Sequence, residues 1–313
     1  MTHSSLVRLD SHRDRLHEAA RFLLESGADP NQTFDSRSPL FGAESDPSPL
    51  SPLYGAAGVN VAHELIHRLD KPFDKTVGKW LLALTWDTGF AIEHVHGHHR
   101  TVGTPADPAT AKRGEYIVLF VFRSTIGQWL SARRTEAERL KRKGEPNTIL
   151  TNRFWRGQLM TLVVVAFYVA FLGPIGILFS LYSGFIGKIY LEVVNYIEHY
   201  GLLREKINGE YGPCTPQHSW NSNKLVTNIG LFNLQRHSDH HANPSRPYEM
   251  LRHIPDSPQH PTGYAAMIVL ALVPPLWFRV MDPRVVALYG GDVSKANLHP
   301  GKAEQLKRRF QSR

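Results

Sequence analysis

The sequence has almost no cysteine. Among its 313 residues, Cys214 is the single one. One thiol cannot form an internal disulfide framework, a cysteine-rich zinc module, or an iron–sulfur or rubredoxin unit within this chain. Hydrophobic residues make up 42% of the sequence and charged residues 20%, which is too apolar for a disordered chain. We therefore expect a folded chain of one large domain or two small ones.

An apolar segment typical of a signal peptide is also missing from the N-terminal region. Residues 1–50 contain 13 charged side chains and no continuous hydrophobic stretch. Residues 31–52 are rich in serine, proline, aspartate and glycine, which indicates a loop or linker.

Charged residues are absent from Gly157 to Gly187, a stretch of 31 residues. A helix needs about 20 apolar residues to cross a bilayer, so this stretch predicts a span, as two helices that separate near Gly173-Pro174. A second candidate span covers Pro261 to Phe278, although Pro274-Pro275 weakens it. A buried helical hairpin in a soluble bundle is the alternative for the long stretch. The length of the uncharged stretch favours membrane insertion over this alternative.

The charge balance is basic, with 36 Lys and Arg against 28 Asp and Glu and a formal charge of +8. Basic side chains gather at residues 133–143 and 301–313. Such segments usually stay on the cytoplasmic side of a membrane. Neither a helix-turn-helix pattern nor aromatic residues interleaved with the basic ones support a nucleic-acid partner, so we expect none.

Histidine is abundant, with 17 residues that gather in clusters. The first cluster is His63-Glu-Leu-Ile-His67, whose spacing of four places both imidazoles on one face of a helix, where they can bind one cation. The same pattern is the zinc-protease motif, with Glu64 as general base. Two ordinary helix histidines are a third interpretation of so short a pattern.

The second cluster is Glu93-His-Val-His-Gly-His-His99. His94 and His98 repeat the spacing of four, and His99 follows directly. His96 lies about 200° from His94 on an α-helix, so we expect it to face away from a metal. Buried imidazoles without partners are costly, so three usable histidines in six residues are hard to explain as structure alone.

The third cluster contains His237, His240 and His241, which again share one helical face. Asp239 is expected to orient a ligand imidazole by accepting its second N–H. A further histidine, His199, ends the segment Asn195-Tyr-Ile-Glu-His199-Tyr-Gly, just after the uncharged stretch.

These clusters supply nine candidate ligands. A zinc site takes about four, so nine are too many for one ion and suit two. Nitrogen-rich ligation disfavours magnesium and calcium and permits iron, copper, zinc or manganese. Two redox metals near apolar helices suggest oxygen chemistry on a lipophilic substrate.

The four histidine segments resemble those of the membrane di-iron alkane 1-monooxygenases, within the fatty acid desaturase and hydroxylase superfamily, and those of the related hydroxylase component of xylene monooxygenase. The resemblance runs from about Gly55 to Leu251, with the segments in the same order. It implies an all-α fold, a multi-helix transmembrane bundle with a histidine-rich di-metal site that faces the cytoplasm. It also implies a multi-pass protein of the bacterial inner membrane, in contact with membrane lipid.

The implied activity is hydroxylation of the terminal carbon of an alkane, a hydrophobic small molecule, by dioxygen at two non-haem iron ions. Electrons would come from a separate rubredoxin or ferredoxin with its NAD(P)H-dependent reductase. The carboxylates expected to support the ligand imidazoles are Glu64, Glu93, Glu198 and Asp239. The implied iron ligands are His63, His67, His94, His98, His99, His199, His237, His240 and His241.

The chain departs from this family upstream of the first cluster. Family members carry several apolar membrane helices there, whereas only 62 residues precede His63 and the first 50 are polar. We interpret the start as a truncated or frame-shifted reading of a longer gene, with a genuinely shortened member as the alternative. The predicted regions are a polar segment 1–52, a membrane di-iron hydroxylase domain 53–285 that lacks the usual first helices, and a basic tail 286–313.

Three other functions stay open at this point. A related hydroxylase or desaturase could act on a fatty acid or on the alkyl side chain of an aromatic compound. A truncated, inactive member would bind iron without turnover. A zinc metalloprotease would leave seven of the nine histidines without a role.

Overall fold

The computed structural model describes residues 51–311, with side chains from 58 to 308. The predicted polar segment 1–52 therefore lies almost entirely outside the described residues. The described part is mostly helical, as the sequence predicts. Its single sheet pairs two short antiparallel strands, with Lys206 opposite Tyr211. The elements are α2 (Ser51–His67), α3 (Pro72–Leu84), α4 (Phe90–Glu93), the π-helix η1 (His94–His98), α5 (His99–Thr101), α6 (Ile117–Lys143), α7 (Arg153–Leu172), α8 (Ile175–His199), β1 (Lys206–Ile207), β2 (Glu210–Tyr211), η2 (Pro216–His218), α9 (Leu225–Gly230), α10 (His237–Ala242), η3 (Tyr248–Met250), α11 (Tyr264–Ala271), α12 (Pro274–Leu288), η4 (Val293–Lys295), η5 (Pro300–Lys302) and α13 (Ala303–Gln311).

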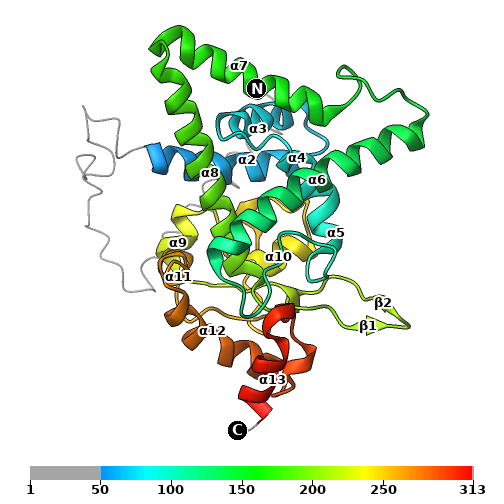
Figure 1. Cartoon of the computed structure of the whole chain (residues 1–313), viewed down its shortest axis with the longest axis vertical. Helices are drawn as coiled ribbons and strands as arrows, with labels where there is room; N and C mark the ends of the chain where they lie inside the picture. The colour runs from blue at the N-terminus through cyan, green and yellow to red at the C-terminus, as the bar shows by residue number, and fades with distance from the viewer. Residues whose placement is uncertain (1–50, 312–313) are drawn as a thin grey trace, which may run out of the picture. The chain divides into compact units, whose positions relative to one another are not determined.

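Helices α7 and α8 form a hairpin (Figure 1). Asn152 begins α7, because its side chain accepts hydrogen bonds from the backbone N–H groups of Phe154 and Trp155. Gly173 ends it with a φ of 63°, which glycine adopts readily, and Pro174 directly precedes α8. The break predicted near Gly173-Pro174 is therefore confirmed. The 20 residues of α7 span about 30 Å, the thickness of a bilayer core.

The apolar side chains of this hairpin face outward. Phe171 is 73% exposed, Leu162 63% and Phe185 62%. Only 17% of the most apolar window of α7 and 39% of that of α8 are buried, whereas the core helix of a soluble protein is mostly buried. Two helices of the described part are thus long and apolar enough to cross a membrane, and their exposed surface favours contact with lipid.

The prediction of a second span over Pro261 to Phe278 is wrong. The chain forms two helices there, the eight-residue α11 and then α12, which begins at Pro274. Proline fits the first turn of a helix, whose N–H groups have no partner within the helix, and it disfavours a continuous helix through its position, because it lacks the backbone N–H. Neither α11 nor the 15-residue α12 is long enough to cross a bilayer.

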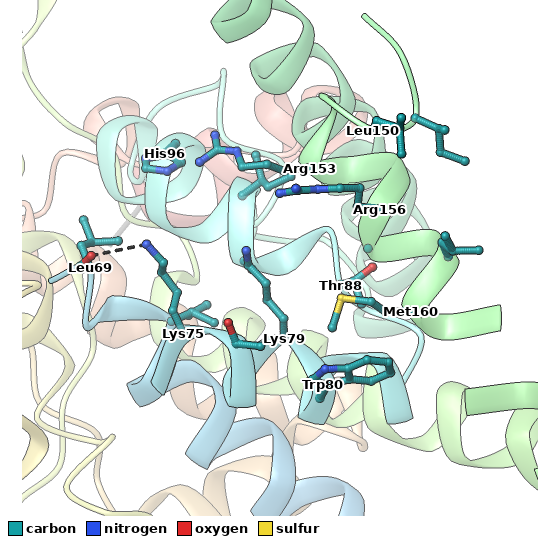
Figure 2. Close-up of a pocket in the computed structure, with 17 residues that line it drawn as sticks. Leu69, Lys75, Lys79, Trp80, Thr88, His96, Leu150, Arg153, Arg156 and Met160 are labelled. Carbon is teal, nitrogen blue, oxygen red and sulfur yellow. Dashed lines mark hydrogen bonds between the residues drawn. The ribbon is translucent and has the colours of Figure 1, made fainter. Parts of the chain in front are cut away.

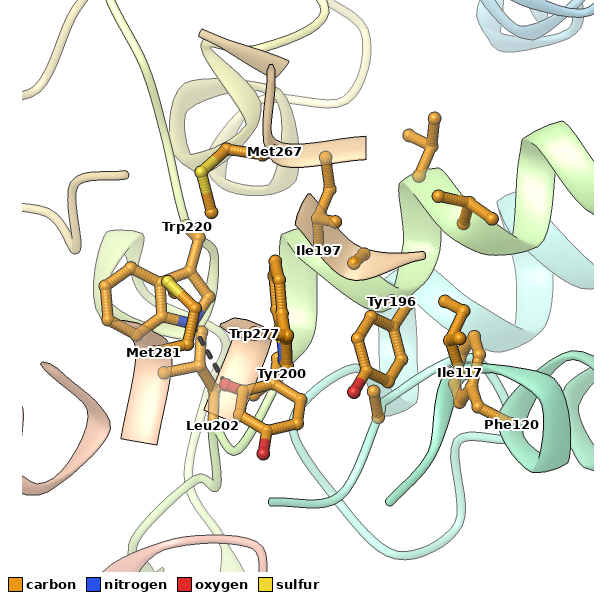
Figure 3. Close-up of a cluster of buried hydrophobic side chains, with 14 of the residues drawn as sticks. Ile117, Phe120, Tyr196, Ile197, Tyr200, Leu202, Trp220, Met267, Trp277 and Met281 are labelled. Carbon is orange, nitrogen blue, oxygen red and sulfur yellow. Dashed lines mark hydrogen bonds between the residues drawn. The ribbon is translucent and has the colours of Figure 1, made fainter. Parts of the chain in front are cut away.

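The main hydrophobic core lies around the C-terminal half of α8 (Figure 3). Tyr196, Tyr200 and Trp277 are fully buried and pack edge to face or tilted, with ring centres 5.2 to 5.3 Å apart. The Tyr200 hydroxyl donates to Asp282 at 2.8 Å and accepts from the N–H of Gly114 at 2.8 Å. These contacts hold the end of α8, where His199 lies, against α12 and the loop before α6.

The C-terminal region packs on the same core. Ala296 is 3% exposed within the main hydrophobic cluster, and Leu306 of α13 is 7% exposed. Arg113 and Leu298 form an isolated parallel bridge. The boundary predicted at residue 285 lies inside α12.

Candidate metal centre

Four parts of the chain bring all nine predicted histidines together. His63 and His67 lie one turn apart near the end of α2. The segment η1–α5 carries the second cluster, His199 ends α8, and the six-residue α10 carries the third cluster. The ring nitrogens form two groups, and within each the ligand atoms lie within 4.8 Å of one another: His63, His67, His94, His99 and His240 in the five-histidine group, and His98, His199, His237 and His241 in the four-histidine group.

The Nε2 atoms of the five-histidine group face one another. His94 Nε2 lies 2.8 Å from His63 Nε2 and 3.1 Å from His99 Nε2. His240 Nε2 lies 3.1 Å from His99 Nε2. The Nε2 atom of His67 has no hydrogen-bond partner among the described residues, although the side chain is buried.

The four-histidine group repeats this arrangement. His237 Nε2 lies 3.3 Å from His199 Nε2 and 3.0 Å from His241 Nε2. His98 Nε2, at 1% residue exposure, has no hydrogen-bond partner in the part of the chain that the structure describes.

Both groups fit a bound transition metal. Metal–nitrogen bonds of about 2.0–2.1 Å place neighbouring ligand nitrogens about 2.9–3.4 Å apart, close to the separations observed here. A buried ring nitrogen without a partner costs about 1–3 kcal/mol, and a cation at the centre of each group would remove that cost. Imidazole nitrogen suits iron, copper, zinc and nickel better than magnesium or calcium.

Burial favours the neutral form of several of these imidazoles, which is the form that binds a metal. Burial and then the neighbouring His98 lower the pKa of His63 to about 3. Burial is also the largest cause that lowers the pKa values of His67, His94 and His240 well below their usual range. A neutral ring offers a lone pair on one nitrogen.

The π-helix η1 determines which histidines of the second cluster join the five-histidine group and which joins the four-histidine group. The N–H of His99 donates to the carbonyl of His94, five residues earlier, so these two histidines face the same way and belong to one group. His98, predicted to pair with His94 by the spacing of four, turns to the other group. Gly97 allows this turn to pack, because a Cβ there would lie 2.8 Å from Glu93 Oε1.

Two supporting contacts were missed from the sequence. His98 Nδ1 lies 3.0 Å from Asp107 Oδ2, and both side chains are buried. His199 Nδ1 lies 3.0 Å from the carbonyl oxygen of His218. Each acceptor fixes a proton on Nδ1 and leaves Nε2 free to bind a metal. Asp107 is in a loop nine residues after His98, where no periodic pattern could have indicated it.

Of the four predicted supporting carboxylates, the structure places Glu198 against a histidine. Glu198 Oε2 lies 3.1 Å from His237 Nε2, the ring nitrogen that faces the other histidines of the group. Glu64 instead pairs with Arg68 at 3.2 Å. Both oxygens of the buried Glu93 are without a hydrogen bond to an imidazole.

Asp239 also has other partners. Its fully buried carboxylate is bound by Arg246, by Arg252 at 2.9 Å and by the side chain of Asn243 at 3.0 Å. These contacts tie the loop after α10 to the helix that carries three of the histidines.

His96 belongs to neither group. It lines a separate cavity with Lys75, Lys79 and Arg153. The prediction that it faces away from the other histidines is therefore confirmed.

A small cavity touches both histidine groups. It has a volume of about 20 Å³, and its lining includes His63, His94, His237 and Glu198. The rest of the lining is largely apolar and includes Val59, Phe90, Leu191 and Val194. The space is about that of one water molecule or methyl group.

Comparison with known proteins identifies the family. The family model described as "Fatty acid desaturase" matches residues 48–271, which include both histidine groups. The chain belongs to the fatty acid desaturase family.

Within this family the chain is similar to alkane 1-monooxygenases. It is 49% identical over 240 residues to alkane 1-monooxygenase 2 of Pseudomonas aeruginosa, which covers 76% of this chain and 63% of that protein. The alkane 1-monooxygenase of Acinetobacter baylyi is 42% identical over 253 residues, 80% of this chain and 62% of that protein. The xylene/toluene monooxygenase hydroxylase component of Pseudomonas putida is 31% identical over 232 residues, 74% of this chain and 61% of that protein. The resemblance seen in the histidine segments is confirmed, and the chain spans less than two thirds of the length of these desaturase-family relatives.

Proposed function

We propose that the chain is an integral membrane, non-haem di-iron monooxygenase that hydroxylates the terminal carbon of alkanes. The observation that carries this proposal is the convergence of nine imidazoles into two adjacent groups, in a chain similar to alkane 1-monooxygenases. The five-histidine group would hold one iron and the four-histidine group the other. When bound, the two irons would activate dioxygen.

The protein's own residues position and isolate this chemistry. Asp107 and the carbonyl of His218 hold His98 and His199 with Nε2 toward the metal. The ring nitrogens lie in a largely water-free site, with eight of the nine histidines 8% exposed or less. Glu198, which lies beside His237 and lines the small cavity, would hold or accept a proton close to the substrate carbon.

The reaction needs two electrons from outside the chain. An alkane, dioxygen, two electrons and two protons give the primary alcohol and water. The single Cys214 cannot hold an iron–sulfur centre, so a reduced rubredoxin or ferredoxin and its NAD(P)H-dependent reductase would supply the electrons.

The substrate would reach the site from the membrane. The apolar cavity wall of Val59, Phe90, Leu191 and Val194 leads to the histidine rings and admits a methyl group. Basic residues precede α7, and Lys and Arg favour the cytoplasmic side of a membrane. Because α8 returns from the membrane and ends at His199, we place the site on the cytoplasmic side of the bacterial inner membrane.

A related hydroxylase that oxidises a methyl group on an aromatic ring is the second candidate. The similarity to the xylene/toluene monooxygenase hydroxylase component favours it over a fatty acid substrate. A zinc metalloprotease is disfavoured, because Glu64 is paired with Arg68 and the two histidines of the motif lie among three others.

Turnover by the purified chain in detergent tests the proposal. With rubredoxin, its reductase and NADH, we expect octane and dioxygen to give 1-octanol, and we expect His240→Ala to give none. Oxidation of xylene but not octane would support the second candidate. Iron-loaded protein that oxidises neither compound would identify an inactive member and contradict the proposed activity.

A further inference from the structure

A second cavity, of about 600 Å³, lies between α3 and the first turns of α7. Figure 2 shows Lys75 and Lys79 rising from α3, while Arg153 and Arg156 extend from α7 toward the same space. Four cationic side chains thus converge on one cavity. A cleft lined by charges of one sign raises the local concentration of ions of the opposite sign.

The acidic residues nearby do not neutralise this cluster. Glu136 pairs with Arg153 at 2.8 Å and also with Arg139 at 2.8 Å, so its single charge is shared. Neither Lys79 nor Arg156 forms an ion pair or a side-chain hydrogen bond with any residue from 58 to 308. Burial, followed by the nearby Arg156, lowers the pKa of Lys79, which is the direction that an unneutralised cation shows.

The cavity also has an apolar side, at the level where α7 becomes a candidate membrane span. Trp80, Leu150 and Met160 are among its lining residues. After Arg156 the sequence has no charged residue until Lys188. Leu159, 49% exposed, continues the apolar surface along α7. Phosphates and acyl chains of a bilayer show the same change from charged to apolar.

We propose that this cavity binds one anionic phospholipid, with its phosphate held by Lys75, Lys79 and Arg156 and an acyl chain along Trp80 and Leu159. The proposal rests on the membrane insertion that belongs to the proposed function. An uncharged alkane would leave the cations unpaired, so the cavity is not a second substrate site. A free phosphate would leave the apolar lining uncovered, which is the physical reason to favour a lipid.

Lipid binding can be measured without any turnover. Native mass spectrometry of the full chain in a non-ionic detergent would count bound dioctanoyl-phosphatidylglycerol, dioctanoyl-phosphatidylcholine or inorganic phosphate. We expect one phosphatidylglycerol per chain, bound at least about tenfold more tightly than phosphatidylcholine of the same chain length. K79A/R156A should weaken phosphatidylglycerol binding at least about tenfold. The charge-conserving K79R/R156K should retain it.

The matched control removes one Lys and one Arg elsewhere. Lys141 and Arg142 are exposed near the end of α6 and line none of the cavities described above, so K141A/R142A should bind phosphatidylglycerol like the native chain. Equal weakening in both double variants would show a general charge effect and overturn the proposal. Phosphatidylcholine bound as tightly as phosphatidylglycerol, or inorganic phosphate bound as tightly as the lipid, would also overturn it.

Two further measurements distinguish a loss of lipid binding from misfolding and from a loss of activity. Iron content and helicity report whether K79A/R156A folds; if it does not, R156A alone, at an exposed side chain, should still weaken binding several-fold. An inactive but folded chain still gives a clear lipid result, so failure of the alkane proposal and failure of the lipid proposal are distinguishable. Purification without detergent would separately show that the chain is not inserted in a membrane.

Discussion

The Nδ1 atom of His98 lies 3.0 Å from the carboxylate of Asp107, in a part of the structure where both side chains are at most 1% exposed. This contact orients the histidine that leaves its own cluster for the four-histidine group. Asp107 also accepts hydrogen bonds from the Thr110 hydroxyl and from the N–H of Ala109 at 3.0 Å. The carboxylate is therefore held in place independently of any metal.

The change Asp107→Asn tests this role. Loss of such a supporting carboxylate typically lowers metal affinity about 10- to 100-fold. We expect that loss at one of the two metals, measured by competition with a chelator. Asp74→Asn, at the carboxylate that pairs with Arg68, is the matched control and should leave both metals bound. Native metal affinity in the Asp107 variant would contradict the role.

Alanine variants of single histidines should separate the two groups. His94→Ala is expected to weaken the metal of the five-histidine group, and His241→Ala that of the four-histidine group, so each should lower the metal content toward one per chain. His96→Ala should keep both metals, because its ring lines the other cavity. The measurement is metal per chain after gel filtration. Loss of metal in His96→Ala would show that the division into groups is incorrect.

The apolar wall of the small cavity should control access of the substrate. Val194→Phe adds a ring beside about 20 Å³ of space, so we expect octane hydroxylation to fall at least about tenfold while the metal content stays native. Val163→Phe, on the outward face of α7 at 50% exposure, is the control and should keep its activity. Equal activity of both variants, measured as 1-octanol formed, would place the substrate elsewhere.

A buried histidine outside the metal groups predicts a pH dependence of stability. Burial lowers the pKa of His260 from about 6.5 to about 3, and its ring stacks on Trp220. Between these two pH values the unfolded chain binds a proton that the folded chain does not. The free energy of unfolding should therefore fall as the pH drops below 6.5, by about 1.4 kcal/mol per pH unit for this residue, and should be unaffected by it above 6.5.

Comparison of His260→Phe with the native chain isolates that contribution. Phenylalanine cannot be protonated, so the free energy of unfolding of the variant should not fall in this way. When the pH is lowered from 7.5 to 5, the free energy of unfolding of the variant minus that of the native chain should rise by about 2 kcal/mol, measured by denaturant unfolding with iron present. The partly exposed His253 provides the control, His253→Phe. A constant difference between His260→Phe and the native chain at all pH values would contradict the prediction.

Helical spacing predicted which histidines meet, but not how they divide. His63 and His67 share a group, as the spacing of four predicts on an α-helix. His94 and His98 have the same spacing and separate, because a π-helix aligns residues five apart. The periodicity of the sequence does not reveal that local widening of the helix, which depends on how the segment packs.

The supporting carboxylates were harder to predict than the ligands. Glu64 and Asp239 stand beside histidines in the sequence, yet arginines bind both. Asp107 acts on His98 through a loop that only the tertiary fold brings back. The membrane spans show a similar contrast. Composition predicted the hairpin with its break at Gly173. It did not predict that the second apolar stretch forms two helices, separated at Pro274, that are too short to span a bilayer.

Metal content is the most direct test of the central claim, that two groups of imidazoles each hold a metal. Iron and zinc should be quantified in the detergent-purified full chain by mass spectrometry, with protein measured by amino-acid analysis. We expect about two irons per chain and little zinc. One zinc and no iron, or no bound metal in a folded chain supplied with iron, would contradict it.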